Sequence, residues 1–206
     1  MSELTKLVSI GNHKIAKNTA IFNLSSANNC PCKDYCSFGI SGKCYALKAE
    51  RMYPSVLPYR ERQHDYWEKN TIAKIIDDFV AFFKSHPKLQ YLRLNEAGDA
   101  KRYSDFLKMD LIACALLKEC GVKTYTYTHN RQELLTYIHL FDSVKYLVIN
   151  LSEDWKDEEL KRFNRFHAVK QFTPFEWQCN CDAGKCMQSC HSCAIQHGNR
   201  IEVKIH

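Results

Sequence analysis

The chain has 206 residues, of which 45% are hydrophobic and 25% charged, and these proportions are ordinary for a globular domain. No apolar run approaches the roughly 18 residues of a transmembrane helix, and the N-terminus lacks a signal peptide's apolar core. We therefore expect one cytoplasmic domain over 1–206, with no membrane association, in which 174–206 forms a cysteine-rich metal-binding segment. The net charge of +6 is compatible with a nucleic-acid partner, although a solvated basic surface explains it equally well. Oligomeric state is not predicted.

The N-terminal part predicts a short hairpin, a buried strand and several helices. Gly11-Asn12 has the turn chemistry to join residues 7–10 to 13–15, and the apolar run 20–24 is typical of a buried strand. The composition or periodicity of three later segments favours helices. These segments are 45–52, 59–69 and 71–84.

Strands and helices alternate through the rest of the chain. The predicted strands are 89–95, 122–128, 144–151 and 168–172, and the predicted helices are 103–118, 132–140 and 155–166. This order predicts an α/β fold with a parallel sheet, either a partial (β/α) barrel or an open, doubly wound sheet. In both forms ligands gather at the carboxyl ends of the strands. Polar or cysteine-rich segments follow those ends, namely 30–36, 96–99, 128–130 and 150–152.

Nine of the eleven cysteines fall into two groups, one near each end of the chain. They are Cys30, Cys32, Cys36 and Cys44 in the first group, and Cys179, Cys181, Cys186, Cys190 and Cys193 in the second. In a reducing compartment such groups favour metal ligation over disulfides, and thiolates suit both zinc and iron–sulfur clusters. Cys190 and Cys193 have the spacing of a zinc knuckle, whereas the other spacings favour one or two [4Fe–4S] clusters. Zinc is the alternative metal, and Cys114 and Cys120 are expected to be ordinary buried side chains.

Several polar side chains near the strand ends are candidates for chemistry. Glu96, Asp99 and His129 have the side chains of acids or bases, and Arg93 and Asn150 are candidates for substrate binding. Capping of the following helix is the alternative role for Asp99. The region from 51 to 67 also mixes basic and aromatic groups that either hold phosphates and stack bases or form an ordinary exposed helix face. This set is Arg51, Arg60, Arg62, His64, Tyr66 and Trp67.

Several short motifs, in order, resemble the phage "gene product eighty-eight" family. They are Cys30-Pro31, Cys36, Cys44-Tyr45-Ala46, Leu92 to Asp99 with Tyr103, Thr126 to His129, Asn150 to Ser152 and Cys190 to Cys193. The chain departs from the family pattern at Cys32, at Cys181 and in the gap from Cys186 to Cys190. The resemblance implies a phage origin, hence the host cytoplasm, and a bound metal, but no particular reaction.

The chain is more loosely similar to radical S-adenosylmethionine enzymes, which place cluster cysteines after the first strand of a partial barrel. Cys32-x3-Cys36 matches the first half of their motif, but the next cysteine, Cys44, lies eight residues on. This similarity implies S-adenosylmethionine as a cofactor and a small-molecule or nucleic-acid substrate. The alternative hypothesis is a non-catalytic module, stabilised by iron–sulfur or zinc, that binds nucleic acid or a host protein.

Overall fold

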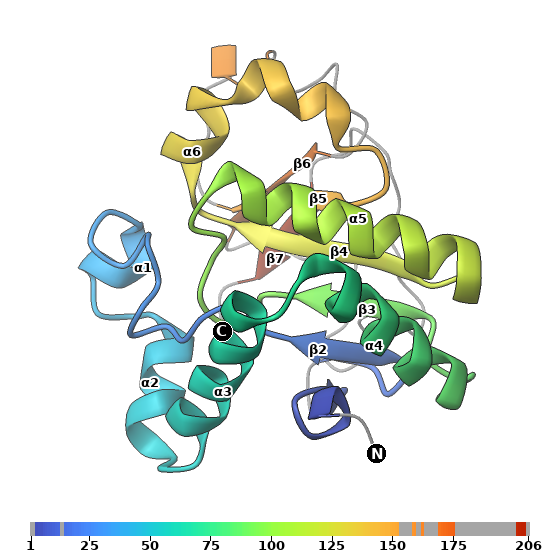
Figure 1. Ribbon diagram of the computed structural model, residues 1–206. Helices are drawn as coiled ribbons and strands as arrows, with labels where there is room; N and C mark the ends of the chain where they lie inside the picture. Colours follow the sequence, from blue (N-terminus) through green and yellow to red (C-terminus); the bar gives the residue numbers. More distant parts are fainter. Residues whose placement is uncertain are drawn as a thin grey trace.

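A computed structural model of the chain describes residues 3–12, 15–152, 158–159, 162, 169–175 and 201–204 (Figure 1). Its strands form one open, mostly parallel sheet. They are β1 Ser9–Ile10, β2 Thr19–Phe22, β3 Tyr91–Leu94, β4 Lys123–Thr128, β5 Val148–Ser152, β6 Val169–Phe175 and β7 Ile201–Lys204. They lie in the sheet in chain order, β1 antiparallel to β2 and every later pair parallel. The predicted α/β class with a parallel sheet is therefore confirmed.

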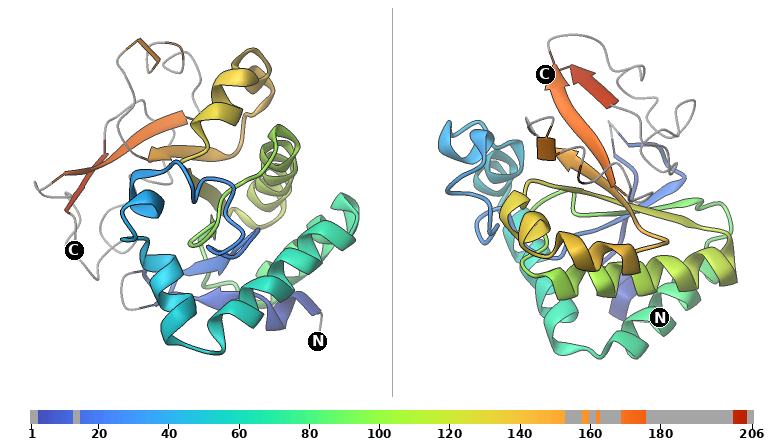
Figure 2. Two further views of the ribbon diagram at one scale, coloured as in Figure 1. Left: turned by 90° about the vertical axis from the view of Figure 1, so that its left-hand side faces the viewer. Right: turned by 90° about the horizontal axis from the view of Figure 1, so that it is seen from above.

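One short helix precedes the sheet, and others connect β2 to β3, β3 to β4 and β4 to β5. They are η1 Glu3–Lys6, α1 Ser37–Ile40, α2 Tyr45–Met52, α3 Val56–Lys69, α4 Ile72–Ser85, α5 Tyr103–Cys120, α6 Arg131–Thr136 and η2 Ile138–Ser143. Figures 1 and 2 show α4 and α5 side by side on one face of the sheet. A doubly wound sheet needs a reversal of strand order, and the described strands have none. The sheet is therefore not doubly wound. It is open, because β1 and β7 do not pair with each other, and its strands keep the order of a partial barrel.

The main hydrophobic core lies between this face of the sheet and the helices. Phe22 on β2 packs edge-on against Phe79 of α4, with ring centroids 5.5 Å apart, and both are fully buried. Leu92 and Leu94 of β3 join the same cluster. The apolar periodicity that predicted a helix over 71–84 is explained by this contact, because the buried residues of α4 form its core-facing stripe.

The basic and aromatic side chains of α3 do not form one exposed surface. Trp67 is completely buried, Tyr66 is 2% exposed and Arg60 is 7% exposed. The Trp67 indole donates a hydrogen bond to Asp105 Oδ1 at 3.2 Å. The proposed exposed face for stacking bases is therefore wrong for these three residues, because they contribute to the protein's interior.

Two predicted elements compare with the structure in different ways. Residues 9–10 pair with β2, while residues 13–14 of the predicted hairpin lie outside the described residues. The predicted strand 144–151 begins at Val148 instead, because the Asp110 carboxylate accepts hydrogen bonds from three consecutive backbone amides, Lys145, Tyr146 and Leu147. A side chain of α5 thus replaces a neighbouring strand as the acceptor.

Two more predicted helices lie in the second half of the chain. The predicted helix 132–140 is divided into α6 and η2. The predicted helix 155–166 lies mostly outside the described residues. Within the described part of the chain, no helix has the length and apolarity to cross a membrane.

Candidate functional site at the carboxyl edge of the sheet

A buried ion pair between α2 and α3 holds the loop that carries the first cysteine group. Glu50 of α2 accepts hydrogen bonds from the backbone amides of Ala27, at 2.7 Å, and Asn28, at 3.0 Å. Arg60 of α3 lies 2.8 Å from the same carboxylate and also donates to the Ala46 carbonyl. Because both charged side chains are nearly inaccessible, with 8% and 2% of their surface exposed, they fix the path of the chain just before Cys30.

The ends of β2 and β3 are tied to each other by two asparagines. Asn23 Oδ1 accepts a hydrogen bond from the Ala97 amide at 2.8 Å, and Asn95 Oδ1 accepts one from the Leu24 amide at 3.0 Å. Asn95 has a φ of 62°, in the left-handed region that asparagine tolerates better than most residues. These bonds hold the loop after β2 against the turn after β3.

Gly98 lets the turn after β3 pack directly on that loop. Its φ is 70°, and a Cβ atom there would lie 2.1 Å from Ser25 Oγ and 2.5 Å from the Ser25 carbonyl oxygen. No side chain fits at that separation. The glycine is therefore required both by the backbone conformation and by the close approach.

Asp99 is the centre of the edge, where it joins three segments. It is 1% exposed, and Oδ1 accepts hydrogen bonds from Thr128 Oγ1 at 2.7 Å and from the Ala100 amide at 2.8 Å. Oδ2 accepts from the His129 amide at 2.6 Å and from Cys32 Sγ at 3.5 Å. Burial raises the pKa of Asp99, although His129 and these hydrogen bonds act in the opposite direction.

The alternative that Asp99 caps the following helix is wrong. The N-cap of α5 is Arg102, and the backbone amides of Lys101 and Arg102 both donate to Asp105 Oδ2 at 3.0 Å. Asp99 instead bonds to the end of β4 and to the cysteine loop.

Cys32 is the cysteine at the centre of this network. Its sulfur is fully buried and lies 3.2 Å from the Tyr35 hydroxyl, which is also 3.0 Å from Asn130 Oδ1. A hydrogen bond with Cys30, burial and the charge of Asp99 all raise the pKa of the Cys32 thiol. Burial and the neighbouring Cys32 also raise the pKa of Tyr35. In the absence of a cation, Cys32 is therefore a neutral thiol.

Cys30 interacts with Cys32, whereas Cys36 and Cys44 of the same group have different surroundings. Cys36 is 7% exposed, and its sulfur accepts a hydrogen bond from the Gly39 amide at 3.2 Å. Cys44 precedes α2 and packs against a small alanine cluster of the same loop region, formed by Ala27, Ala46 and Ala97. Within the described ranges, no three His, Cys, Asp or Glu side chains are arranged to hold a metal ion. The second group, Cys179, Cys181, Cys186, Cys190 and Cys193, lies outside the described residues.

The two remaining acid–base candidates lie on either side of Asp99 in the chain. Glu96 Oε1 accepts a hydrogen bond from Asn12 Nδ2 at 2.6 Å, while the Glu96 carbonyl accepts one from the Tyr45 hydroxyl at 2.5 Å. The His129 ring is partly buried and packs edge-on against Phe38, with centroids 6.1 Å apart. Asp99 and His129 are thus brought together, but through the His129 backbone and not through its ring.

Arg93 and Asn150 both lie on the sheet face opposite the helices. Arg93 is paired in register with Tyr125, and Asn150 with Tyr127, so all four share that face. The Arg93 guanidinium lies 4.8 Å from the Tyr127 ring centroid. Asn150 is completely buried, and its Nδ2 donates to the Thr126 carbonyl at 3.0 Å.

The residues that build the edge were largely missed from the sequence. Glu50, Asn23 and Asn95 hold loops by bonds to backbone groups far along the chain, and no periodic pattern indicates such bonds. The one available signal was the Asn-Glu-Ala-Gly-Asp run after β3, where a strand end coincides with turn residues.

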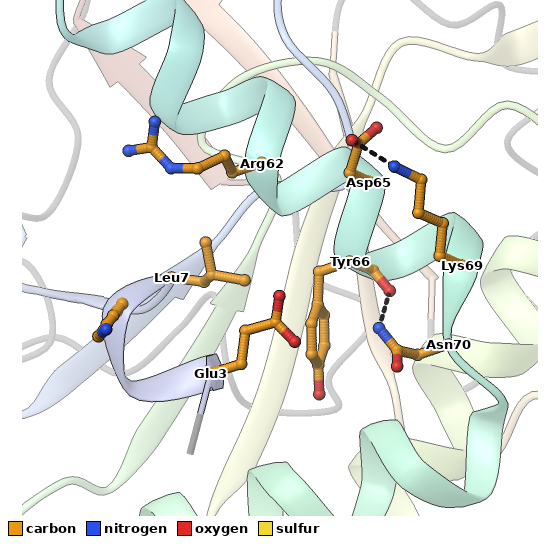
Figure 3. Close-up of a pocket in the computed structure, with 8 residues that line it drawn as sticks. Glu3, Leu7, Arg62, Asp65, Tyr66, Lys69 and Asn70 are labelled. Carbon is orange, nitrogen blue, oxygen red and sulfur yellow. Dashed lines mark hydrogen bonds and ion pairs between the residues drawn. The ribbon is translucent and has the colours of Figure 1, made fainter. Parts of the chain in front are cut away.

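A separate cavity of about 420 Å³ lies between η1 and α3 (Figure 3). None of the predicted catalytic, substrate-binding or metal-binding residues lines it. Asp65 and Lys69 at its wall form an exposed ion pair at 2.7 Å, and Asn70 Nδ2 donates to the Tyr66 carbonyl. Its walls carry charges of both signs, so it has no clear preference for an anion or a cation.

Fold and edge together define an α/β protein with an open parallel sheet and a cysteine loop held by buried polar side chains. The chain belongs to the gene product 88 family, a family of phage type, whose model matches residues 3–174. The family resemblance expected from the sequence motifs is thereby confirmed, whereas the looser likeness to radical S-adenosylmethionine enzymes receives no support. No curated protein and no solved structure matches the chain. The second cysteine group lies beyond the matched residues.

Proposed function

We propose that this chain is a phage-encoded iron–sulfur protein of the host cytoplasm, with cluster ligands in both cysteine groups. The observation that carries the proposal is the arrangement of the first group at the carboxyl edge. Cys30 and Cys32 interact with each other there, and Cys36 follows in the same short loop. Parallel α/β sheets bind their ligands at this edge, so a metal centre here would lie where substrates arrive.

The donor chemistry of the loop suits iron. Thiolates are soft ligands, and hydrogen bonds to the sulfurs, such as the one from the Gly39 amide to Cys36, tune bound clusters. The raised pKa of Cys32 argues against a free thiolate, but a coordinated metal cation deprotonates its thiol ligand outright. When bound, an iron–sulfur cluster supplies one-electron chemistry. The protein's part is to hold the loop rigid and shield it from water.

In an enzyme of this kind, the side chains around the edge would divide the work. Glu96 and His129 are the candidates for acid–base chemistry, and Arg93 and Asn150 for substrate contact. Asp99 acts as a positioning residue, because all its hydrogen bonds go to the protein's own loops. A reaction with S-adenosylmethionine is a narrower form of the proposal, which needs one cluster iron without a cysteine ligand.

The test is anaerobic purification with iron, sulfide and zinc measured on one sample, together with an absorption spectrum. About four or eight irons with matching sulfide support the proposal. Cys32→Ser and Cys36→Ser should then lower the iron content, whereas Cys120→Ser should not, because that sulfur bonds only weakly to the Val80 carbonyl, at 3.9 Å. Zinc without sulfide would overturn the proposal in favour of a metal-stabilised module that binds nucleic acid or a host protein.

S-adenosylmethionine is tested on the same sample by electron paramagnetic resonance of the reduced protein. A changed cluster signal on addition of the cofactor supports the narrower form. An unchanged signal at saturating cofactor removes that form and leaves the iron–sulfur proposal in place.

A further inference from the structure

The sheet face opposite the helices carries the positive charge of Arg93, which has no ion-pair partner among the described residues. Arg93 lies at the third position of β3 and is partly buried. Glu96 is the carboxylate that contributes to its electrostatics, and one of its oxygens accepts a hydrogen bond from Asn12. An arginine held in this way favours an anion from outside the described residues.

Aromatic rings surround the charge. Burial acts to lower the pKa of Arg93, but the acidic groups near it, Tyr45 first and Glu96 among them, outweigh burial, and the net shift is upward. The guanidinium is charged near neutral pH in any case. Tyr127 also presents its ring to the guanidinium at 4.8 Å. A guanidinium stacked on a ring keeps its N–H groups directed outward in the guanidinium plane, where a carboxylate or phosphate can accept two of them.

Two buried donors at this end of β3 have no acceptor among the residues that the structure describes. Arg93 Nε is inaccessible to solvent and forms no hydrogen bond, and the same holds for Asn95 Nδ2, two residues along the chain. Asn95 is 3% exposed, and the bond from the Leu24 amide to its Oδ1 fixes which atom of the amide is the nitrogen. A buried donor without a partner destabilises the fold, because it has lost its hydrogen bonds to water. Since both unsatisfied groups are N–H donors, the missing partner is an acceptor and not a cation.

We infer that Arg93 and Asn95 bind the oxyanion, a carboxylate or a phosphate, of a small molecule lying on the sheet face opposite the helices. The aromatic rings beside Arg93 would contact the ligand's less polar part. The ligand is a substrate only if the proposed function holds, so the inference rests on that function. It adds the chemical class of the substrate. Oxyanion binding and metal content are separate measurements, so either proposal can fail without the other.

The experiment titrates the full chain, purified anaerobically, with inorganic phosphate and with benzoate at constant ionic strength. At tenfold excess over the dissociation constant, at least one of the two oxyanions should raise the Tm by roughly 3–6 °C in a saturable way. A response to only one of them distinguishes a phosphate ligand from an aromatic carboxylate. Arg93→Met should lose the response. Arg62→Met is the matched control, because Arg62 also lies over a tyrosine ring, that of Tyr59, but is exposed.

A second measurement covers the case in which Arg93→Met fails to fold. The ¹⁵N signal of Arg93 Nε in the wild-type chain, assigned by its absence in Arg93→Lys, should shift saturably with the same oxyanion. No shift with either oxyanion, or an equal Tm response in wild type and Arg93→Met, would overturn the inference. Iron and sulfide measured on the same samples show separately whether the cluster proposal stands.

Discussion

The helix-covered face of the sheet and its carboxyl edge are both buried, yet they are built from opposite kinds of side chain. The helix face is held by contacts such as that between Phe22 and Phe79. The edge is held by Glu50, Asp99 and Asn95, which are 8%, 1% and 3% exposed, and each of them accepts hydrogen bonds from backbone amides. The same strands thus border an apolar environment along one face and a polar environment at their carboxyl ends.

The difference shows how stability and function are divided in this fold. Apolar packing is non-directional and tolerates adjustment, so it supplies stability without fixing the position of any loop. Buried carboxylates and amides fix loops closely, because an unsatisfied partner is costly. The edge therefore uses polar groups where position matters, and the core uses apolar groups where it does not.

The largest expected loss of stability comes from removing a packed side chain from the helix-covered face. Phe79→Ala deletes a fully buried ring and should lower the free energy of unfolding by about 4 kcal/mol, measured by urea denaturation. Folded molecules of this variant should keep the wild-type metal content, because the edge is untouched. A loss of metal in proportion to the loss of stability would contradict the division between the two regions.

The second-largest expected loss of stability comes from breaking the buried ion pair of Glu50 and Arg60, which holds the cysteine loop. Glu50→Gln leaves the Arg60 guanidinium buried without its counter-charge and should cost about 3 kcal/mol. Hydrogen exchange at the Ala27 and Asn28 amides should also become faster. Glu119→Gln is the control, since its ion pair with Lys84 is exposed and should contribute nothing measurable. Unchanged exchange at both amides would show that Glu50 does not hold the loop.

A pair of glycines separates backbone strain from close packing at the edge. Gly98 and Gly121 have nearly equal φ angles, 70° and 67°, but an added Cβ meets Ser25 at Gly98 and nothing within 4 Å at Gly121. Gly121→Ala should therefore cost about 1 kcal/mol, from strain alone. Gly98→Ala should cost about 2–3 kcal/mol, because overpacking adds to the strain. Equal costs in thermal denaturation would mean that the edge yields to the extra methyl group.

The smallest expected effect lies at the outer rim of the helix layer and depends on pH. Partial burial acts to raise the pKa of Asp78, but hydrogen bonds from Lys74 and Tyr66 outweigh burial, and the net shift is downward. A lowered pKa stabilises the fold above the ordinary value of about 3.9 and loses that contribution as pH falls through the folded-state pKa. Near neutral pH the free energy of unfolding of the wild type should exceed that of Asp78→Asn by about 0.5 kcal/mol, a small difference because solvent screens this partly exposed pair. Urea denaturation should show the gap closing toward acid pH; a gap that widens there would contradict the assignment.

Periodicity predicted the elements well where local contacts decide them. The stripe of apolar residues in α4 and the end of α5 at Gly121, which has the left-handed conformation, follow from neighbours a few residues apart. The start of β5 and the burial of Trp67 could not be predicted, because each depends on an aspartate of α5 more than thirty residues away, Asp110 and Asp105 respectively.

The sequence by itself determined the α/β class, the parallel sheet, the family and the cysteine loop after the first buried strand. Those properties are written in alternation, spacing and motif order, which involve residues close together in the chain. The tertiary structure alone decided that Asp99 joins Cys32 to the end of β4 and that Glu50 and Arg60 hold the loop. It also decided that Arg93 and Asn95 keep buried donors without an acceptor in the described part of the chain. These are relations between distant segments, and they arise only when burial forces each polar group to find its partner in space or to remain without one.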